Sequence, residues 1–193
     1  MSTIINADTS NGLKLTSDTS GEIKLQSAGA DIATVDSTGL TMASGKLLSP
    51  TGPTFSAYLN ANQNIATSTF TKVALNAELF DTDNNFDTST SRFTPTVAGY
   101  YQINGLAFLS ATKGNQIVTL YKNGTEFTRG NQMNNTVAAS RGLNLSILVY
   151  ANGSSDYFEL YAYHATGITE EVLGLTGGGI HLSHFQAYLA RAA

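Results

Sequence analysis

The segment DTDNNFD, residues 81–87, has the residue types and spacing closest to those of a metal site. Four oxygen-bearing side chains stand at alternate positions: Asp81, Asp83, Asn85 and Asp87. A calcium-binding helix–loop–helix begins in this way, but its loop requires glycine at the sixth position and a bidentate glutamate at the twelfth. The chain has Phe86 and Arg92 at those positions. We therefore predict a solvated loop, with a calcium site of another type as the alternative.

The three histidines, His164, His181 and His184, are the other candidate metal ligands. They fall in segments whose alternation of apolar and polar residues is typical of strands. Residues three apart in a strand point to opposite faces, so His181 and His184 do not form a ready pair of ligands. The alternative is that one histidine per chain meets a metal ion or an anion on the axis of a threefold assembly. We predict that no metal is bound.

The usual signatures of catalysis are missing from the sequence. It has no G-x-S-x-G nucleophile elbow. It also has no cysteine, which excludes thiol catalysis, disulfides and Cys-type zinc sites. The segment TGGGI, residues 176–180, is not followed by Lys-Ser or Lys-Thr, so it predicts a hairpin rather than a phosphate-binding loop. We predict a protein that is not an enzyme and has no catalytic residue and no cofactor.

Composition narrows the classes of partner. Charged residues make up only 12% of the chain, about half the usual share, and Ser, Thr, Asn and Gly favour strands and turns in their place. A net charge of −4 predicts no nucleic-acid partner. The lack of any run of about 18 apolar residues predicts no membrane insertion. The N-terminus MSTIINADTSNG lacks the basic and apolar regions of a secretory signal, so we expect folding in a cytoplasm.

The aromatic residues divide the chain into two parts. All 9 Phe and 9 Tyr lie from Phe55 onward. Aromatic side chains supply much of the buried area of a core, so a segment without them is expected to pack against copies of itself or against a partner. Two of the three prolines, Pro50 and Pro53, mark a linker between the parts. The predicted divisions are an arm at residues 1–48, a Pro/Gly linker at 49–54 and a head at 55–193.

The arm repeats a short alternating run followed by a turn, as in GEIKLQSAGA and DIATVDST. Disordered tails do not usually space their apolar residues by two, so an extended β-type arm is favoured over a flexible tail. Fully stretched at about 3.3 Å per residue, residues 1–48 would span at most about 160 Å. The predicted docking side consists of the alternating apolar residues: Leu13, Leu15, Ile23, Leu25, Ile32, Val35, Leu40 and Met42.

The head has the pattern of an all-β domain. Runs such as YYQINGLAFLS, QIVTLYKNG and RGLNLSILVY alternate apolar and polar residues, and turn signals such as KNG, ANGSSD and TGGG separate them. No window has a convincing helical period. Residues 55–193 are enough for a hydrophobic core of their own. About eight to ten short strands in this length indicate a β-sandwich or jelly roll.

Four residues near the middle of the head carry a resemblance to a known family. Phe93, Pro95, Gly99 and Tyr101 resemble the F-x-x-P-x-x-G-x-Y motif of the complement and tumour-necrosis-factor jelly-roll superfamily. The resemblance implies that Pro95 and Gly99 fix a bend into a strand, while Phe93 and Tyr101 fill the core beneath it.

Further motifs extend the resemblance over residues 55–189. The Lys122-Asn123-Gly124 segment is similar to the family's K-N-G hairpin, and the end of the chain is similar to its closing S-x-F-x-x-x-L strand, with Ser183, Phe185 and Leu189. Asp156 stands where the family has the aspartate of a G-D-x-V step. That step is degenerate here, because the flanking residues are Ser155 and Phe158. The implied fold class is an all-β jelly-roll sandwich preceded by an extended β-arm.

The resemblance also implies a compact homotrimer. Three tyrosines in the run DYFELYAYH share one face of the expected strand: Tyr157, Tyr161 and Tyr163. Tyrosine tolerates burial at an interface with its hydroxyl still in contact with water. We therefore predict that this face is the trimer interface, with an ordinary second face of the sandwich as the alternative.

The arm is similar to N-terminal segments of tailed-phage virion proteins, which need no export signal because lysis releases them. We predict a virion structural protein: a trimeric capsid decoration or cement protein on the virion surface that stabilises the shell. Its residues 1–48 would dock on the major capsid protein or another virion protein. One alternative is a short tail fibre or receptor-binding protein that contacts a host surface glycan or protein. A second is a secreted complement-like trimeric ligand.

Overall fold

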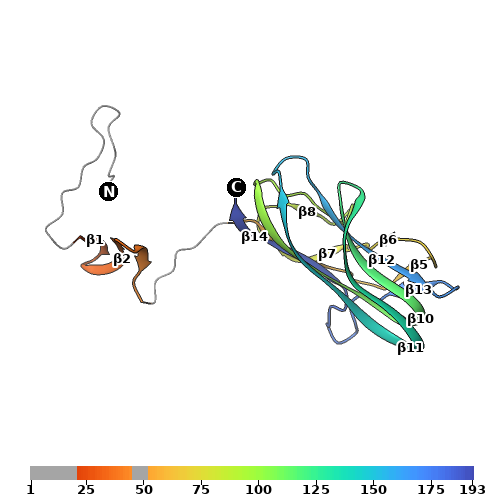
Figure 1. Ribbon diagram of the computed structural model, residues 1–193. Coiled ribbons are helices and arrows are strands. Elements are labelled where there is room, and N and C mark those ends of the chain that lie inside the picture. The colour runs from red at the N-terminus through yellow and green to blue at the C-terminus, as the bar shows by residue number, and fades with distance from the viewer. Residues whose placement is uncertain (1–20, 45–51) are drawn as a thin grey trace. The chain divides into compact units, whose positions relative to one another are not determined.

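The computed structural model describes residues 21–44 and 52–193 of the chain (Figure 1). The chain forms two compact units, Met1–Thr51 and Gly52–Ala193. Leu13 and Leu15 of the predicted docking side lie outside the described residues. All secondary structure in the described residues is β, and they include no helix that could cross a membrane.

The described part of the arm is a three-stranded antiparallel meander. Its strands are β1 (Ile23–Ser27), β2 (Ala30–Asp36) and β3 (Gly39–Met42), in the order β1-β2-β3. Ala28 and Gly29 form the first turn, with φ angles of 51° and 78°. In the second turn the Asp36 side chain accepts hydrogen bonds from the backbone N–H and the hydroxyl of Thr38. The turns that contain Gly, Ser and Asp therefore fold this segment back on itself twice, instead of leaving it fully stretched.

The two faces of this sheet, which we call the arm sheet, differ in character. Residues that lie opposite each other in an antiparallel sheet share a face, so the pairing register shows which face each side chain is on. One face carries the rows Ile23–Val35–Leu40 and Leu25–Ala33–Met42. The other face carries Lys24, Thr34 and Thr41. Ile32 lies at a register shift between the pairs Leu25–Ala33 and Gln26–Asp31, where alternation assigns no face, so its place on the docking side stays a prediction.

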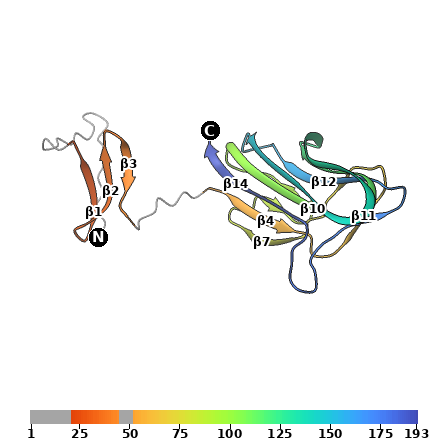
Figure 2. The ribbon, with the colours of Figure 1, turned by 60° about the horizontal axis from the view of Figure 1, so that its bottom comes forward.

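The head is built from eleven strands. They are β4 (Thr54–Tyr58), β5 (Gln63–Ile65), β6 (Thr71–Lys72), β7 (Ala77–Asp81), β8 (Phe86–Asp87), β9 (Arg92–Phe93), β10 (Gly99–Lys122), β11 (Thr125–Ala151), β12 (Phe158–Ala165), β13 (Glu170–Val172) and β14 (His184–Ala192). The order along the main path is β7-β4-β14-β10-β12-β9-β8, with β11 paired to β10 (Figure 2).

The strands form two packed layers. The front sheet consists of β7, β4, β14, residues 99–109 of β10 and residues 141–151 of β11. The back sheet consists of residues 115–122 of β10, residues 125–135 of β11, β12 and the short strands β6, β8 and β9. The predicted all-β jelly-roll sandwich is therefore observed, but with two very long strands that each run through both layers.

The sequence predicted YYQINGLAFLS and QIVTLYKNG as separate strands, whereas the structure joins them in β10. Between them the pairing with β11 shifts register twice, on either side of Thr112. Gly114 has a φ of 88°, in the left-handed region that glycine tolerates. Such irregularities let a strand bend sharply while its pairing continues beyond them. The segment between the two predicted strands is thus the bend that carries β10 from the front sheet to the back sheet.

Aromatic residues fill the core between the layers. The Phe55 ring lies 4.6 Å from Phe93 and 5.4 Å from Phe185. Tyr101 packs edge-on against Phe93 at 5.5 Å, and its hydroxyl donates a 2.8 Å hydrogen bond to the Val97 carbonyl. Burial raises the pKa of Tyr101 to about 12. Three of the residues that carry the family resemblance are therefore fully buried aromatic side chains.

The remaining residues of the resemblance shape the backbone around this core. Pro95 is buried, and Leu189 packs against the core cluster. A Cβ atom on Gly99 would lie 2.5 Å from the carbonyl oxygen of Arg191 and 3.0 Å from the Cα atom of Ala192. Glycine at position 99 therefore lets the last strand, β14, lie directly against the start of β10.

Candidate interaction surfaces

The outer face of the front sheet exposes aromatic and aliphatic side chains. One row across the strands holds Arg191, Tyr100 and Tyr150, and the next holds Tyr188, Gln102 and Leu148. Tyr188 and Leu148 are 51% and 56% exposed, and the two tyrosines of the first row are about as exposed. We call this surface the front face. An exposed apolar patch of this kind is found at interaction sites more often than elsewhere on a protein surface.

The middle of the front face is polar but uncharged. The Gln102 Nε2 group donates a 3.0 Å hydrogen bond to the Ser146 hydroxyl, which donates in turn to Asn104 Oδ1 at 2.8 Å. In the next row lies His184, opposite Leu106 and Tyr58. Burial and the nearby His181 lower the pKa of His184, so its neutral form is favoured. The centre of this face can therefore be covered without taking an unpaired charge out of water.

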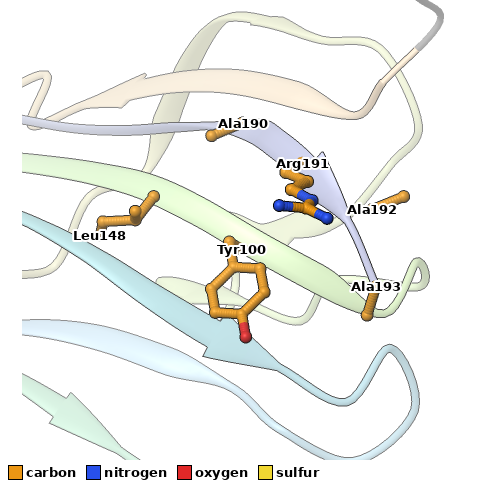
Figure 3. A pocket seen from close by; sticks show the side chains of 6 residues that line it. All are labelled: Tyr100, Leu148, Ala190, Arg191, Ala192 and Ala193. Atoms are coloured by element: carbon orange, nitrogen blue, oxygen red, sulfur yellow. The ribbon is translucent and has the colours of Figure 1, made fainter.

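At one end of the front face the apolar side chains border a pocket of about 510 Å³ (Figure 3). It is lined by Tyr100, Leu148, Ala190, Arg191, Ala192 and Ala193. The lining side chains are apolar apart from the hydroxyl of Tyr100 and the guanidinium of Arg191, a composition that suits a contact surface. A smaller pocket of about 230 Å³ lies further along the same face, beside Phe80 and Tyr188.

The three tyrosines predicted to form the trimer interface lie on the outer face of the back sheet. Each has an aromatic or cationic partner in its own chain. The Arg92 guanidinium lies 3.8 Å from the Tyr157 ring, and Tyr161 stacks on Tyr121 with ring centroids 3.8 Å apart. Tyr163 packs on Phe70 at 4.8 Å. The outward orientation follows the alternation of β12, but these rings are partly covered by their own chain, and their role in an interface stays a prediction.

A buried ion network lies beneath this aromatic cluster. The Glu159 side chain is only 3% exposed, and its Oε1 atom accepts from Lys72 Nζ at 3.2 Å and from Arg92 at 3.0 Å. Lys72 also donates to the Thr90 carbonyl at 2.8 Å. The network joins β12 to β6 and β9. It therefore fixes these short strands against β12, and its role is structural.

In the acidic loop that begins at Asp81, the carboxylates accept hydrogen bonds from neighbouring residues of the same segment. Asp81 accepts hydrogen bonds from the backbone N–H groups of Asp83 and Phe86 at 3.2 and 2.7 Å. Hydrogen bonds from Ser89 and Thr90 lower the pKa of Asp87 to about 2. Within residues 21–44 and 52–193 no three His, Asp or Glu side chains come together as metal ligands would.

The histidines occupy different environments. His164 is fully buried, and its ring nitrogens lie 3.1 Å from the Ile65 carbonyl and 3.0 Å from the Thr166 hydroxyl. It therefore links β12 to the segment at β5. His181 packs against the Tyr58 ring at 4.1 Å, next to the hairpin of residues 176–180, in which the Thr176 N–H donates to the Ile180 carbonyl.

Asp156 joins two loops at the end of the sandwich nearer Gly99. Its Oδ1 atom accepts from Asn123 at 2.8 Å, and its Oδ2 atom accepts from Lys122 Nζ at 2.9 Å and from the Asn152 N–H at 3.0 Å. The Asn123 side chain also accepts from the Tyr157 N–H at 2.9 Å. The K-N-G hairpin and the aspartate, two separate parts of the family resemblance, thus form one hydrogen-bonded unit.

We expect Asp156→Asn to lower the free energy of unfolding at pH 7 by about 1–3 kcal/mol, because hydrogen bonds to a buried charge are lost. Burial opposes the ionisation of Asp156, but hydrogen bonds from Asn123, Lys122 and Asn152 hold its pKa below the ordinary value. The stabilisation is therefore present above the unfolded pKa, about 3.9, and is lost as the pH falls through the folded pKa. Thermal melts from pH 7 down to the acid limit measure both effects.

The control for this prediction is Asp83→Asn, which removes a carboxylate at the surface of the acidic loop. We expect the control to keep the wild-type acid profile and the Asp156→Asn variant to show a flatter one. Parallel profiles for the wild type and Asp156→Asn would contradict the assignment of this carboxylate as a source of acid sensitivity.

No protein-family model and no curated protein matches the sequence. Among solved structures, the head is similar to the globular domain of zebrafish complement 1qA protein, with a TM-score of 0.51 and 16% identity over 73% of this chain and 99% of that one. It is also similar to Eiger TNF from S. frugiperda, with a TM-score of 0.54 and 7% identity over 74% of this chain and 94% of that one.

A third likeness, to PRD1 vertex protein P5, has a TM-score of 0.42 and 15% identity over 72% of this chain and 96% of that one. At these identities the first two structures establish a shared fold. Of the residues on which the sequence resemblance rests, Phe93, Tyr101 and Phe185 lie in the core of that fold, and Gly99 lies where two strands approach closely. The predicted fold is thus confirmed, and the head of this chain is a jelly roll similar in fold to these complement and tumour-necrosis-factor structures.

Proposed function

We propose that this chain is a structural protein of a phage virion, a homotrimer that decorates the capsid and acts as a cement protein. The jelly-roll head is exposed on the virion surface. Residues 1–48 dock it on the major capsid protein or on another virion protein. No catalytic residue, metal or cofactor has a part in this function.

The arm sheet is the observation that carries the proposal. Its apolar face includes Leu25 and Leu40, which are 50% and 54% exposed. A single sheet needs a second layer to cover such a face, and within residues 21–44 the arm sheet is the only layer. An element that is incomplete by itself suits packing with other chains in an assembly. The resemblance of this segment to N-terminal parts of tailed-phage virion proteins favours a virion as that assembly.

The front face supports self-association as a trimer. Its exposed rings and aliphatic side chains lie on regular strands of a rigid sheet, and its polar centre is uncharged. Aromatic side chains on such a surface are typical of the centre of a protein–protein interface. We therefore place the trimer contact on the front face, where the tyrosines have solvent-exposed surface left to bury, rather than on the covered tyrosines of the back sheet.

One feature of the head favours the second candidate, a short tail fibre or receptor-binding protein. The most exposed large apolar side chains, Val137, Ile168 and Ile180, are 68%, 64% and 62% exposed. Val137 lies in β11 opposite the bend of β10, Ile168 in the loop between β12 and β13, and Ile180 in the loop between β13 and β14. In this role these segments would contact a host surface glycan or protein. A secreted complement-like ligand is the third candidate.

The number of copies per particle separates these candidates. Quantitative mass spectrometry of purified virions, referred to the coat protein, gives that number directly. Hundreds of copies would support decoration of the capsid lattice. A few trimers per particle would place the protein on the tail or at one vertex and favour host attachment, and its absence from particles would overturn both virion roles.

A further inference from the structure

The charges of the arm sheet are confined to one of its faces. Lys24 lies 3.3 Å from Asp31 and 4.0 Å from Glu22, and the Gln26 side chain donates to Asp31 at 2.6 Å. Lys24 shares its face with Thr34 and Thr41. None of the six residues on the apolar face is charged: Ile23, Leu25, Ala33, Val35, Leu40 and Met42. The apolar face can therefore be buried without the desolvation of any charged group.

We propose that the apolar faces of the three arm sheets in a trimer pack against one another around a common axis. This inference rests on the proposed homotrimer and goes beyond it, because it makes the docking element a single three-sided prism rather than three independent arms. The charged faces then point outward on all three sides. Within residues 21–44, β1 and β3 each pair on one side only, so their outer edges are available for pairing with strands of a virion protein.

The short connection to the head favours copies of this chain over other occupants. Only residues 45–51 separate the described arm from the described head, and seven residues span at most about 25 Å. A trimeric head would therefore hold three arm sheets in a small volume, at an effective concentration in the millimolar range. An unlinked partner must reach the apolar face by diffusion and gain enough contact to compete with two tethered copies.

The small size of the side chains also suits a threefold arrangement. The middle strand β2 contributes Ala33 and Val35 to the apolar face, while the flanking strands contribute the longer Leu25, Leu40 and Met42. Small residues at the centre of each sheet let three sheets approach a common axis, and the longer side chains at the margins fill the corners between neighbouring sheets.

Cysteine cross-linking of the full chain tests this arrangement cleanly, because the natural sequence has no cysteine. Val35→Cys places a thiol on the apolar face, and the matched control Thr34→Cys places one on the charged face of the same strand. After treatment with a short bismaleimide, we expect Val35→Cys to give a product of two linked chains in up to two thirds of the protein. Thr34→Cys is expected to remain as single chains.

A second pair on β3, Leu40→Cys and Thr41→Cys, repeats the comparison at a position that leaves the central strand intact. The native mass of each variant is measured in parallel by light scattering. A trimeric mass with no cross-link at either Val35→Cys or Leu40→Cys would overturn this inference alone and would assign the apolar face to other residues of the chain or to the virion partner. A monomeric mass would overturn the proposed homotrimer itself.

Discussion

Replacing Leu148 with aspartate is expected to convert the trimer into monomers. In the proposed trimer this side chain is buried at the contact between chains, where three new carboxylates would lose water and repel one another. Even with the Arg191 guanidinium at the same pocket, we expect these costs to exceed what a few apolar contacts contribute. Light scattering at micromolar concentration should therefore report a mass near the 20.4 kDa of one chain, instead of three times that value.

The structure makes Leu148 a better target than the aromatic core. It is 56% exposed in the single chain, so a polar replacement leaves the packing between the sheets intact. Across the strands it faces Gln102, an uncharged residue that tolerates a carboxylate beside it. We therefore expect the Leu148→Asp monomer to keep the melting profile of a folded sandwich, which distinguishes dissociation from unfolding.

The matched control is Phe127→Asp, which removes an apolar side chain that is 49% exposed but belongs to the back-sheet part of β11. We expect this variant to remain a trimer. A trimer that survives Leu148→Asp and is dissociated by Tyr163→Asp would assign the contact to the tyrosines of β12, as the sequence predicted. The two sets of residues are on opposite layers, so one experiment decides between them.

The sequence predicted the fold because the signals that determine it are local. Alternation in the head predicts strands, and the glycine-rich turns separate them. Phe93, Tyr101 and Phe185 lie in the core, where an aromatic residue on the inner face of a strand is expected. The bend of β10 was missed because a strand that crosses between layers through register shifts and a left-handed glycine has the same residue pattern as a turn.

The surfaces were harder to predict because they depend on contacts between distant segments. Alternation placed Tyr161 and Tyr163 on the outside of β12, but it does not show that Tyr121 and Phe70 cover them. That pairing follows from the register of three strands and a loop, which no local pattern specifies. The exposed residues Tyr100 and Leu148 do alternate with buried neighbours in the sequence. However, only the pairing of β10 with β11 and β14 shows that they form one face.

Deleting residues 1–48 is expected to abolish docking on the virion and to leave the head folded and trimeric. The residues of the core cluster all belong to the head, from Phe55 to Ala187. The deletion stops before Pro53, whose carbonyl accepts a 3.0 Å hydrogen bond from the Leu189 N–H and thus anchors the start of the head. Removal of the arm sheet therefore takes away the proposed docking element and leaves the sandwich intact.

The measurement is co-sedimentation of the purified protein with particles that lack it. Full-length protein should pellet with these particles, and the truncated protein should stay in the supernatant while its mass and melting temperature remain those of a folded trimer. Full-length Phe127→Asp serves as the control, since it alters the head and keeps the arm. Truncated protein that unfolds would show that the head depends on the arm, and truncated protein that still pellets would show that the head docks by itself. Either result would contradict the division into a docking arm and a self-sufficient head.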